Sequence, residues 1–206
     1  MKKLFATFLF LIVIPITTSS LFSFHDSRFI KEEPIIQVTP LGNIDQKYVE
    51  LVQGYLQDFY GFKCVIGERI PLTDDILASS KTRYEASKII TKYNSKKNVL
   101  LLTDVDIAIF NKERNIKEYG IIGLGFRPGT TCVVSSFRIK KGVPEAKMLD
   151  RLKKVAIHEI GHNLGLDHCT NNKKCLMNDK KGKISQIDFE DVWLCDKCSR
   201  QIGRFN

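Results

Sequence analysis

Residues 158 to 168 read His158-Glu159-Ile160-Gly161-His162-Asn163-Leu164-Gly165-Leu166-Asp167-His168. On an α-helix, residues four positions apart lie about 40° apart around the axis, so His158 and His162 can bind one metal ion with Glu159 beside them. The next helical turn cannot bring His168 to a tetrahedral position. The pattern therefore predicts a sharp bend at Gly165, which tolerates a positive φ. Three histidine ligands leave the fourth position of Zn²⁺ to water, which is typical of a catalytic site.

The specificity of this pattern comes from its length. His-Glu-x-x-His alone fixes three positions and would be a weak signal. Gly165 and His168 extend it to H-E-x-x-H-x-x-G-x-x-H, the zinc signature of metzincin metallopeptidases. The chain has four histidines, and three of them are in this stretch. A surface helix with incidental histidines is therefore a poor explanation.

Four cysteines and a methionine follow the histidines: Cys169, Cys175, Met177, Cys195 and Cys198. This order resembles the archaemetzincins, in which four cysteines bind a second zinc and a methionine turn lies beneath the catalytic zinc. The resemblance implies a structural zinc at these four cysteines and the turn at Met177. Five residues separate the first two cysteines, where the family is expected to have four. A loop absorbs one extra residue at little entropic cost.

The combined pattern predicts a zinc-dependent metallopeptidase that acts on peptide or protein substrates. Zn²⁺ held by the three histidines would lower the pKa of its water toward about 7 and polarise the scissile carbonyl. Glu159 would act as general base and pass the proton to the leaving amine. Two alternatives remain: a zinc-binding protein of the cell envelope with a vestigial site, and a zinc amidohydrolase acting on a non-peptide substrate. We expect two Zn²⁺ ions per chain and a monomer.

The fold expected from 206 residues with 43% hydrophobic content is one well-buried domain. Apolar periodicity predicts strands at 34–40, 62–70, 99–102, 120–126 and 131–137. It predicts helices at 44–60, at 84–93 and from Pro144 through the zinc motif, the first of them capped by Asn43. A last helix is predicted from Ser185 to the last cysteines, with Ile187, Phe189, Val192 and Trp193 packed inward. The resemblance implies an α/β (α+β), metzincin-like zincin fold. That fold has a mixed twisted sheet of about five strands, an active-site helix and a small zinc-stapled C-terminal subdomain.

Several segments between these elements carry predictions of their own. Residues 106–110 fit either helix or strand, and 111–118 is expected to be a charged surface loop. The last two strands are expected to form a hairpin. In metzincin-like folds its first strand is an edge that receives the substrate backbone, and its glycines could equally mark a bulge or twisted edge. Asp104 and Asp106 are expected to form a turn, with calcium binding as the alternative.

The cysteines leave further alternatives open. In an exported chain they could form disulfides rather than bind zinc. A redox role for Cys195 and Cys198 is discounted because the pair lies at the carboxy terminus. Cys64 and Cys132 fall in predicted strands and are expected to be buried apolar residues, with a disulfide between them as the alternative.

The amino terminus predicts export. Lys2 and Lys3 precede an apolar run, so residues 1–24 are expected to be a signal peptide or an uncleaved membrane anchor, 25–33 a linker, and 34–206 the metallopeptidase domain. The expected location is exported, periplasmic or extracellular, or anchored to the membrane through this segment. No propeptide with a zinc-blocking cysteine is evident. The net charge of +9 without a basic and aromatic pattern predicts a solvated surface and no nucleic-acid binding, with weak attraction to anionic envelope polymers as the alternative.

Overall fold

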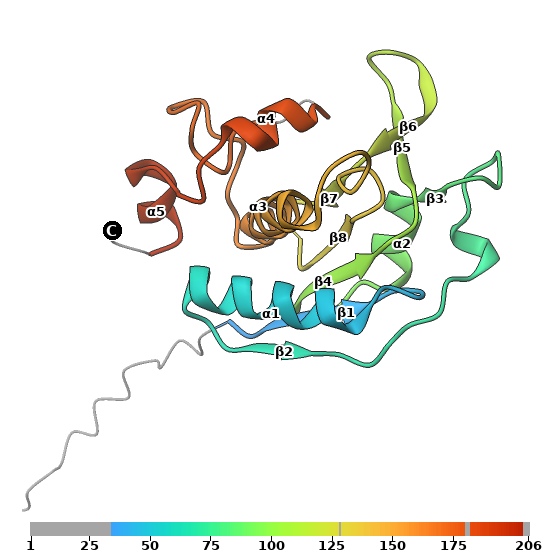
Figure 1. The fold of residues 1–206 in the computed structure, drawn as a ribbon, viewed down its shortest axis with the longest axis horizontal. Helices are drawn as coiled ribbons and strands as arrows, with labels where there is room; N and C mark the ends of the chain where they lie inside the picture. The colour runs from blue at the N-terminus through green and yellow to red at the C-terminus, as the bar shows by residue number, and fades with distance from the viewer. Residues whose placement is uncertain (1–33, 128, 180–181, 204–206) are drawn as a thin grey trace, which may run out of the picture. The chain divides into compact units, whose positions relative to one another are not determined.

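The computed structural model of the chain describes residues 34–127, 129–179 and 182–203, so the predicted signal or anchor and the linker lie outside the described residues. The strands are β1 (Ile36–Pro40), β2 (Cys64–Ile66), β3 (Tyr84–Glu85), β4 (Asn98–Thr103), β5 (Ile107–Asn111), β6 (Ile116–Ile121), β7 (Gly123–Gly125) and β8 (Thr131–Ser135). The helices are α1 (Gln46–Tyr60), α2 (Ala86–Lys92), α3 (Glu145–Asn163), α4 (Ile184–Phe189) and α5 (Asp196–Gln201), with a 3₁₀ turn at Asp74–Ile76 (Figure 1).

A five-stranded mixed sheet in the order β2-β1-β4-β8-β7 forms the centre of the fold. The first four strands are parallel, and β7 pairs antiparallel with β8 at the edge. The prediction of a mixed sheet of about five strands is confirmed. The predicted hairpin is also confirmed, although its first strand is limited to Gly123–Gly125.

Both faces of the central strand β4 are buried, as its unbroken apolar run predicted. Leu100 and Leu102 belong to the core formed with α1 and α3. Val99 and Leu101 belong to a second core formed with α2. The motif helix α3 therefore packs against the sheet, close to its edge strand β7.

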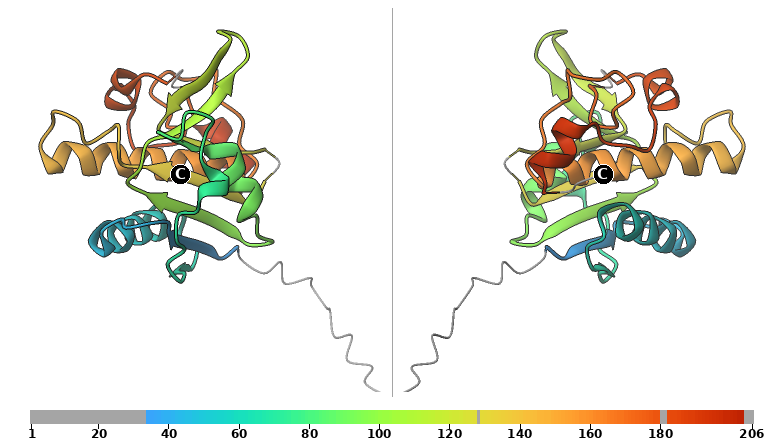
Figure 2. Two further views of the ribbon diagram at one scale, coloured as in Figure 1. Left: turned by 90° about the vertical axis from the view of Figure 1, so that its right-hand side faces the viewer. Right: turned by 90° about the vertical axis from the view of Figure 1, so that its left-hand side faces the viewer.

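The segment expected to be a charged surface loop is mostly a β-hairpin, so that expectation is wrong. β5 and β6 pair antiparallel and, with β3, form a second sheet in the order β3-β5-β6. Asn115 closes the turn with φ 51, a conformation that asparagine tolerates better than most residues. In Figure 2 this hairpin projects away from the central sheet.

Other boundaries differ from the sequence prediction. Asp45, and not Asn43, caps α1, because its carboxylate accepts a hydrogen bond of 2.9 Å from the Lys47 amide. The predicted strand 62–70 pairs only as β2 before one further bridge at Ile70. Tyr84–Glu85 pairs with β5, so the second helix begins at Ala86.

The predicted single helix from Ser185 is also wrong, because the chain forms α4 and α5 with an extended connection between them. Within that connection, the Trp193 carbonyl accepts a hydrogen bond of 2.9 Å from the Leu176 amide. Ile187 is buried as predicted, whereas Phe189 and Trp193 are 47% and 36% exposed. Pairing with the loop around Leu176 therefore replaces the helical bonds that the periodicity suggested.

An ion-pair cluster fixes α4 to the motif helix. Asp188 accepts hydrogen bonds of 2.8 and 2.7 Å from Arg151, and Lys147 lies 3.0 Å away.

Among the described residues, no helix combines the length and apolar character needed to span a bilayer.

Candidate active site and second metal site

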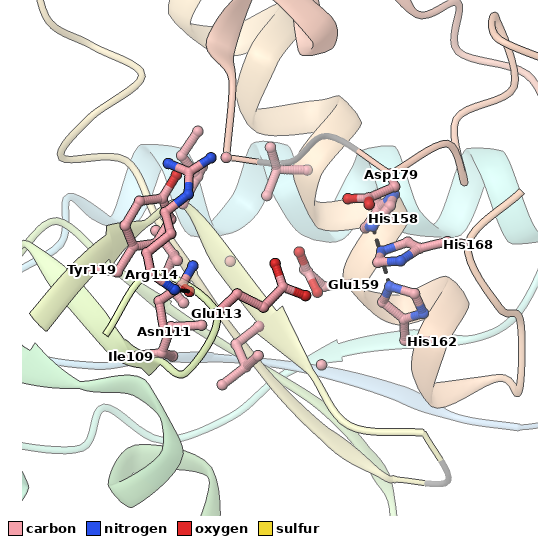
Figure 3. Close-up of a pocket in the computed structure, with 17 residues that line it drawn as sticks. Ile109, Asn111, Glu113, Arg114, Tyr119, His158, Glu159, His162, His168 and Asp179 are labelled. Atoms are coloured by element: carbon pink, nitrogen blue, oxygen red, sulfur yellow. Dashed lines mark hydrogen bonds between the residues drawn. The ribbon is translucent and has the colours of Figure 1, made fainter. Parts of the chain in front are cut away.

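The helix α3 ends as the sequence predicted, in a turn at Gly165. The Gly165 amide donates to the His162 carbonyl and the Leu166 amide donates to the Gly161 carbonyl, both at 2.9 Å. Gly165 has φ +94, so this is a Schellman ending with glycine at its left-handed position. The reversal brings His168 back to the two histidines of the helix. The ligating ring nitrogens of all three lie within 4.8 Å of one another (Figure 3).

Backbone carbonyls orient the two helical histidines. His158 Nδ1 lies 2.7 Å from the Leu176 oxygen, and His162 Nδ1 lies 2.8 Å from the Leu166 oxygen. A carbonyl accepts hydrogen bonds only, so each Nδ1 carries the proton in the neutral ring. Both Nε2 atoms are then lone-pair donors, and they face each other at 3.2 Å.

This arrangement fits a zinc ion. Two unprotonated nitrogens cannot hydrogen-bond to each other, and a cation between them removes their repulsion. Tetrahedral Zn–N bonds of about 2.05 Å place two nitrogens about 3.4 Å apart, close to the separation of the two Nε2 atoms. His168, which is more exposed, provides the third nitrogen.

Glu159 lies between α3 and the edge strand β7, where two glycines make room for it. A Cβ atom on Gly123 would lie 2.6 Å from Glu159 Oε1, and one on Gly125 would lie 3.2 Å from His162 Cβ and 3.3 Å from Glu159 Oε2. The glycines therefore let the strand pack directly against the motif helix. This packing role was not among the explanations that the sequence suggested for them.

Met177 packs against the motif helix from the turn Cys175–Asn178, which is closed by a hydrogen bond of 2.9 Å from the Asn178 amide to the Cys175 carbonyl. A Cβ on Gly161 would lie 2.5 Å from Met177 Sδ, so the fully buried thioether fits against the helix only because residue 161 is glycine. The same turn provides the carbonyl of Leu176 that holds His158.

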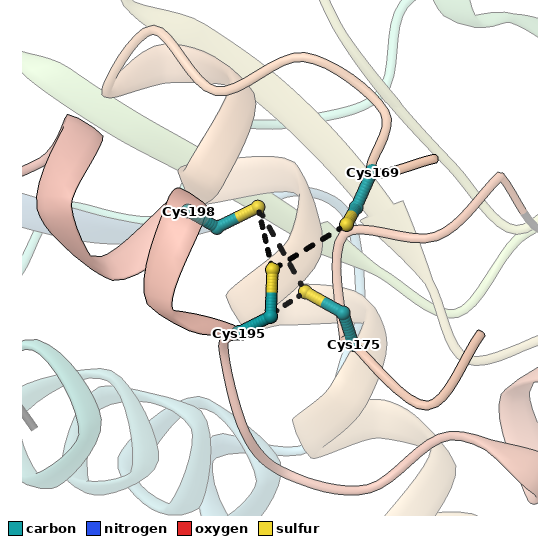
Figure 4. Close-up of side chains that lie close together, drawn as sticks. All are labelled: Cys169, Cys175, Cys195 and Cys198. Atoms are coloured by element: carbon teal, nitrogen blue, oxygen red, sulfur yellow. Dashed lines mark hydrogen bonds between the residues drawn. The ribbon is translucent and has the colours of Figure 1, made fainter. Parts of the chain in front are cut away.

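The four cysteines converge on a second site (Figure 4). Cys169 and Cys195 have their sulfurs 3.6 Å apart, Cys195 and Cys198 3.7 Å, and Cys175 and Cys198 3.8 Å. Zn–S bonds of about 2.3 Å in a tetrahedron place sulfurs about 3.8 Å apart, whereas a disulfide requires about 2.05 Å. All four are free thiols, and their arrangement fits a zinc tetrathiolate.

The acidities of these thiols agree with a site built for a cation. Burial opposes ionisation of Cys195, but the Cys198 amide and neighbouring side chains donate hydrogen bonds that lower its pKa to about 7. Burial raises the pKa of Cys175 to about 11, and burial together with the charge of Cys175 raises the pKa of Cys198 further. The Cys195 thiolate forms readily, whereas Cys175 and Cys198 ionise only with a positive ion among the sulfurs.

A cleft of about 600 Å³ opens at the histidines and extends to the β5–β6 hairpin. Its lining includes Asn111, Glu113, Arg114 and Tyr119 of the hairpin. The sequence analysis missed these residues because the segment was interpreted as a surface loop. The asparagines at 111 and 115, typical turn residues, were the one local signal of a hairpin.

The remaining candidates lie outside the cleft. Asp106 accepts hydrogen bonds from Arg83 at 2.9 Å and from Arg138 at 2.7 and 3.0 Å, so two guanidinium groups occupy its carboxylate and the calcium alternative fails. Cys64 and Cys132 are buried and unbridged, as expected of apolar residues. Burial, followed by the charge of Glu159, raises the pKa of the Cys132 thiol.

Comparison with known proteins agrees with this geometry. The model of peptidase family M54 matches residues 69–204, more than half of the chain. Archaemetzincins of Natronomonas pharaonis and Archaeoglobus fulgidus are 28% and 29% identical over 179 and 170 residues, and each alignment covers 81% of this chain and 98% of the relative. The crystal structure of archaemetzincin from A. fulgidus, complexed with malonate, is similar with a TM-score of 0.70 at 25% identity over 81% of this chain and 99% of that chain. Archaemetzincin from Methanopyrus kandleri shares the fold, with a TM-score of 0.67 at 22% identity over 82% of this chain and 93% of that chain. The chain belongs to peptidase family M54, the archaemetzincin family of zinc metallopeptidases.

Proposed function

We propose that this metallopeptidase hydrolyses peptide bonds at the three-histidine site, with Glu159 as the general base. The observation that carries the proposal is the pair of unprotonated Nε2 atoms of His158 and His162, 3.2 Å apart and beside a glutamate that lines the cleft. Zinc bound there supplies Lewis acidity, which polarises a carbonyl and lowers the pKa of a coordinated water toward about 7. Glu159 takes the proton of the attacking water and transfers it to the leaving amine.

The protein around Glu159 supports this role. Its side chain is held in a gap beside Gly123, and the residue as a whole is only 7% exposed. Restricted access to solvent keeps the carboxylate in one orientation and limits competing water. The carboxylate also lines the cleft in which a substrate would lie.

We infer that a second zinc is bound by Cys169, Cys175, Cys195 and Cys198. Four buried thiols support this inference, because three of their sulfur separations are 3.6 to 3.8 Å and all lie within 4.8 Å. The ion closes the C-terminal segment onto the loop that follows His168. Its role is structural, because four protein ligands leave no position for a substrate.

The substrate backbone is proposed to add to β7. This strand is the edge of the central sheet, and Gly123, Leu124 and Gly125 line the cleft beside the histidines. An extended peptide paired with this edge passes the metal site with its side chains alternating between the cleft and solvent. We expect the protein to act as a monomer.

Export remains part of the proposal and rests on residues 1–24, where two lysines precede an apolar run. Fractionation of cells that produce the full chain tests it, together with amino-terminal sequencing of the mature protein. Recovery of the uncleaved chain in the soluble cytoplasmic fraction would contradict export.

Peptide cleavage by the zinc-loaded protein tests the function. We expect cleavage of internally quenched peptides that a chelator abolishes and zinc restores. Glu159→Gln should retain zinc and lose about a hundredfold or more in turnover. Glu68→Gln makes the same chemical change on an exposed residue outside the cleft and should leave turnover unchanged.

The outcomes separate the alternatives. Full activity of Glu159→Gln would remove the general-base role. Hydrolysis of simple amides without cleavage of peptides would favour an amidohydrolase. Zinc binding without hydrolysis of either class would favour a zinc-binding envelope protein.

A further inference from the structure

The turn of the β5–β6 hairpin has a defined conformation beside the cleft. Asn111 Oδ1 accepts a hydrogen bond of 3.0 Å from the Arg114 amide, and Asn115 adopts the left-handed conformation that closes the turn. Glu113 and Arg114 both line the cleft. In Figure 3 the Glu113 side chain extends from this turn toward Glu159.

The two charged residues of this turn differ in their surroundings. The guanidinium of Arg114 lies 5.4 Å from the centre of the Tyr119 ring, so the aromatic face holds it. Glu113 is exposed and forms no ion pair or side-chain hydrogen bond with any residue that the structure describes. A third carboxylate, that of Asp179, lines the same cleft.

The lining of the cleft also contains apolar side chains. Ile109, Ile121 and Ile122 are among them. A subsite with an apolar floor and a carboxylate at its rim suits a long side chain that has an aliphatic stem and a cationic end. Lysine and arginine are the two residues with that composition.

We propose that Glu113 is a specificity-determining residue that selects peptides with a lysine or arginine side chain under the β5–β6 hairpin. The stem packs on the isoleucines and the cation pairs with the Glu113 carboxylate. The proposal rests on the peptidase function proposed above and adds a substrate class to it. Because the pair is solvent-accessible, we expect a preference of about threefold to tenfold in kcat/KM for lysine or arginine over leucine.

Two sets of peptides test the proposal. A mixture of internally quenched peptides, analysed by mass spectrometry, first identifies which substrate position near the cleaved bond affects the rate. Peptides that carry lysine, arginine, leucine or glutamate at that position then give the ratio of kcat/KM values. We expect the ratio of lysine to leucine to fall close to one in Glu113→Gln. In Glu113→Lys we expect peptides with glutamate to be cleaved faster than peptides with lysine.

The matched control is Glu68→Gln, which removes a carboxylate outside the cleft and should keep the wild-type ratio. A wild-type ratio near one, or a lysine preference that survives in Glu113→Gln, would overturn the assignment while leaving peptidase activity established. Failure to cleave any peptide would overturn the proposed function and this inference with it.

Discussion

His158 Nδ1 lies 2.7 Å from the carbonyl oxygen of Leu176, the residue that follows Cys175. The histidine site and the proposed cysteine site are therefore joined through one peptide unit. A second connection is covalent, because His168 of one site precedes Cys169 of the other. The Cys169 amide also donates to the Met177 carbonyl at 2.7 Å. The cysteine site therefore fixes the backbone that orients His158 and His168, two of the three histidines.

Loss of a distant cysteine should weaken zinc binding at the histidines. Cys198 lies on α5, far from the histidines in sequence, and Cys198→Ala removes one ligand of the second site. We expect this variant to lose that zinc and to bind zinc at the histidines about tenfold to a hundredfold more weakly, the usual effect of losing groups that orient metal ligands. Competition with a chromophoric chelator measures the affinity. Cys64→Ala, which alters a buried thiol outside both sites, is the control, and equal affinities in the two variants would disprove the coupling.

A methyl group at position 123 should displace the general base. The Cβ of Gly123→Ala would lie within 2.9 Å of three Glu159 side-chain atoms, so the carboxylate must move. We expect zinc content to stay unchanged and kcat to fall about tenfold or more, because small displacements of a catalytic group are costly. Gly54→Ala in α1, where a Cβ meets no atom within 4 Å, should leave kcat unaffected. If Gly123→Ala keeps wild-type kcat, the position assigned to Glu159 is wrong.

Acid should loosen the contact between α3 and α4. Hydrogen bonds from Arg151, and then from Lys147, lower the pKa of Asp188 from 3.8 to about 2. Because the pKa of Asp188 is lower in the folded state, its ion pairs contribute fully to stability above about pH 4. That contribution is lost as the pH falls toward 2. Asp188→Asn should be less stable at neutral pH by about 1–2 kcal/mol, because Arg151, only 7% exposed, loses its carboxylate partner. Urea unfolding at pH 7 and at pH 3 measures both effects, and a stability difference that is the same at the two values would contradict this explanation.

The sequence identified the parts of the fold that depend on local pattern. The spacing of His158 and His162 required a helix, and Gly165 required a bend, and the structure has both. The apolar run of β4 matched a strand that is buried on both faces, because such a strand has no polar alternation.

What the sequence did not predict depends on long-range pairing. The charged segment after Asn111 looks like a loop because both faces of its hairpin carry polar residues, so alternation between apolar and polar residues is lost. The cleft wall, including Glu113, was missed for that reason. The periodicity after Ser185 likewise suggested one helix, whereas Trp193 pairs with the backbone of Leu176. Such contacts between distant residues leave no local signal.

Metal content tests the central claim most directly. Elemental analysis of the chain purified without chelator should give two zinc ions per chain, with four cysteines protected from thiol reagents until the metal is removed. One zinc ion with no reactive thiols among Cys169, Cys175, Cys195 and Cys198 would replace the second metal by disulfides and keep the enzyme. Absence of zinc, even after refolding with the metal, would contradict the assignment of His158, His162 and His168 as a catalytic metal site.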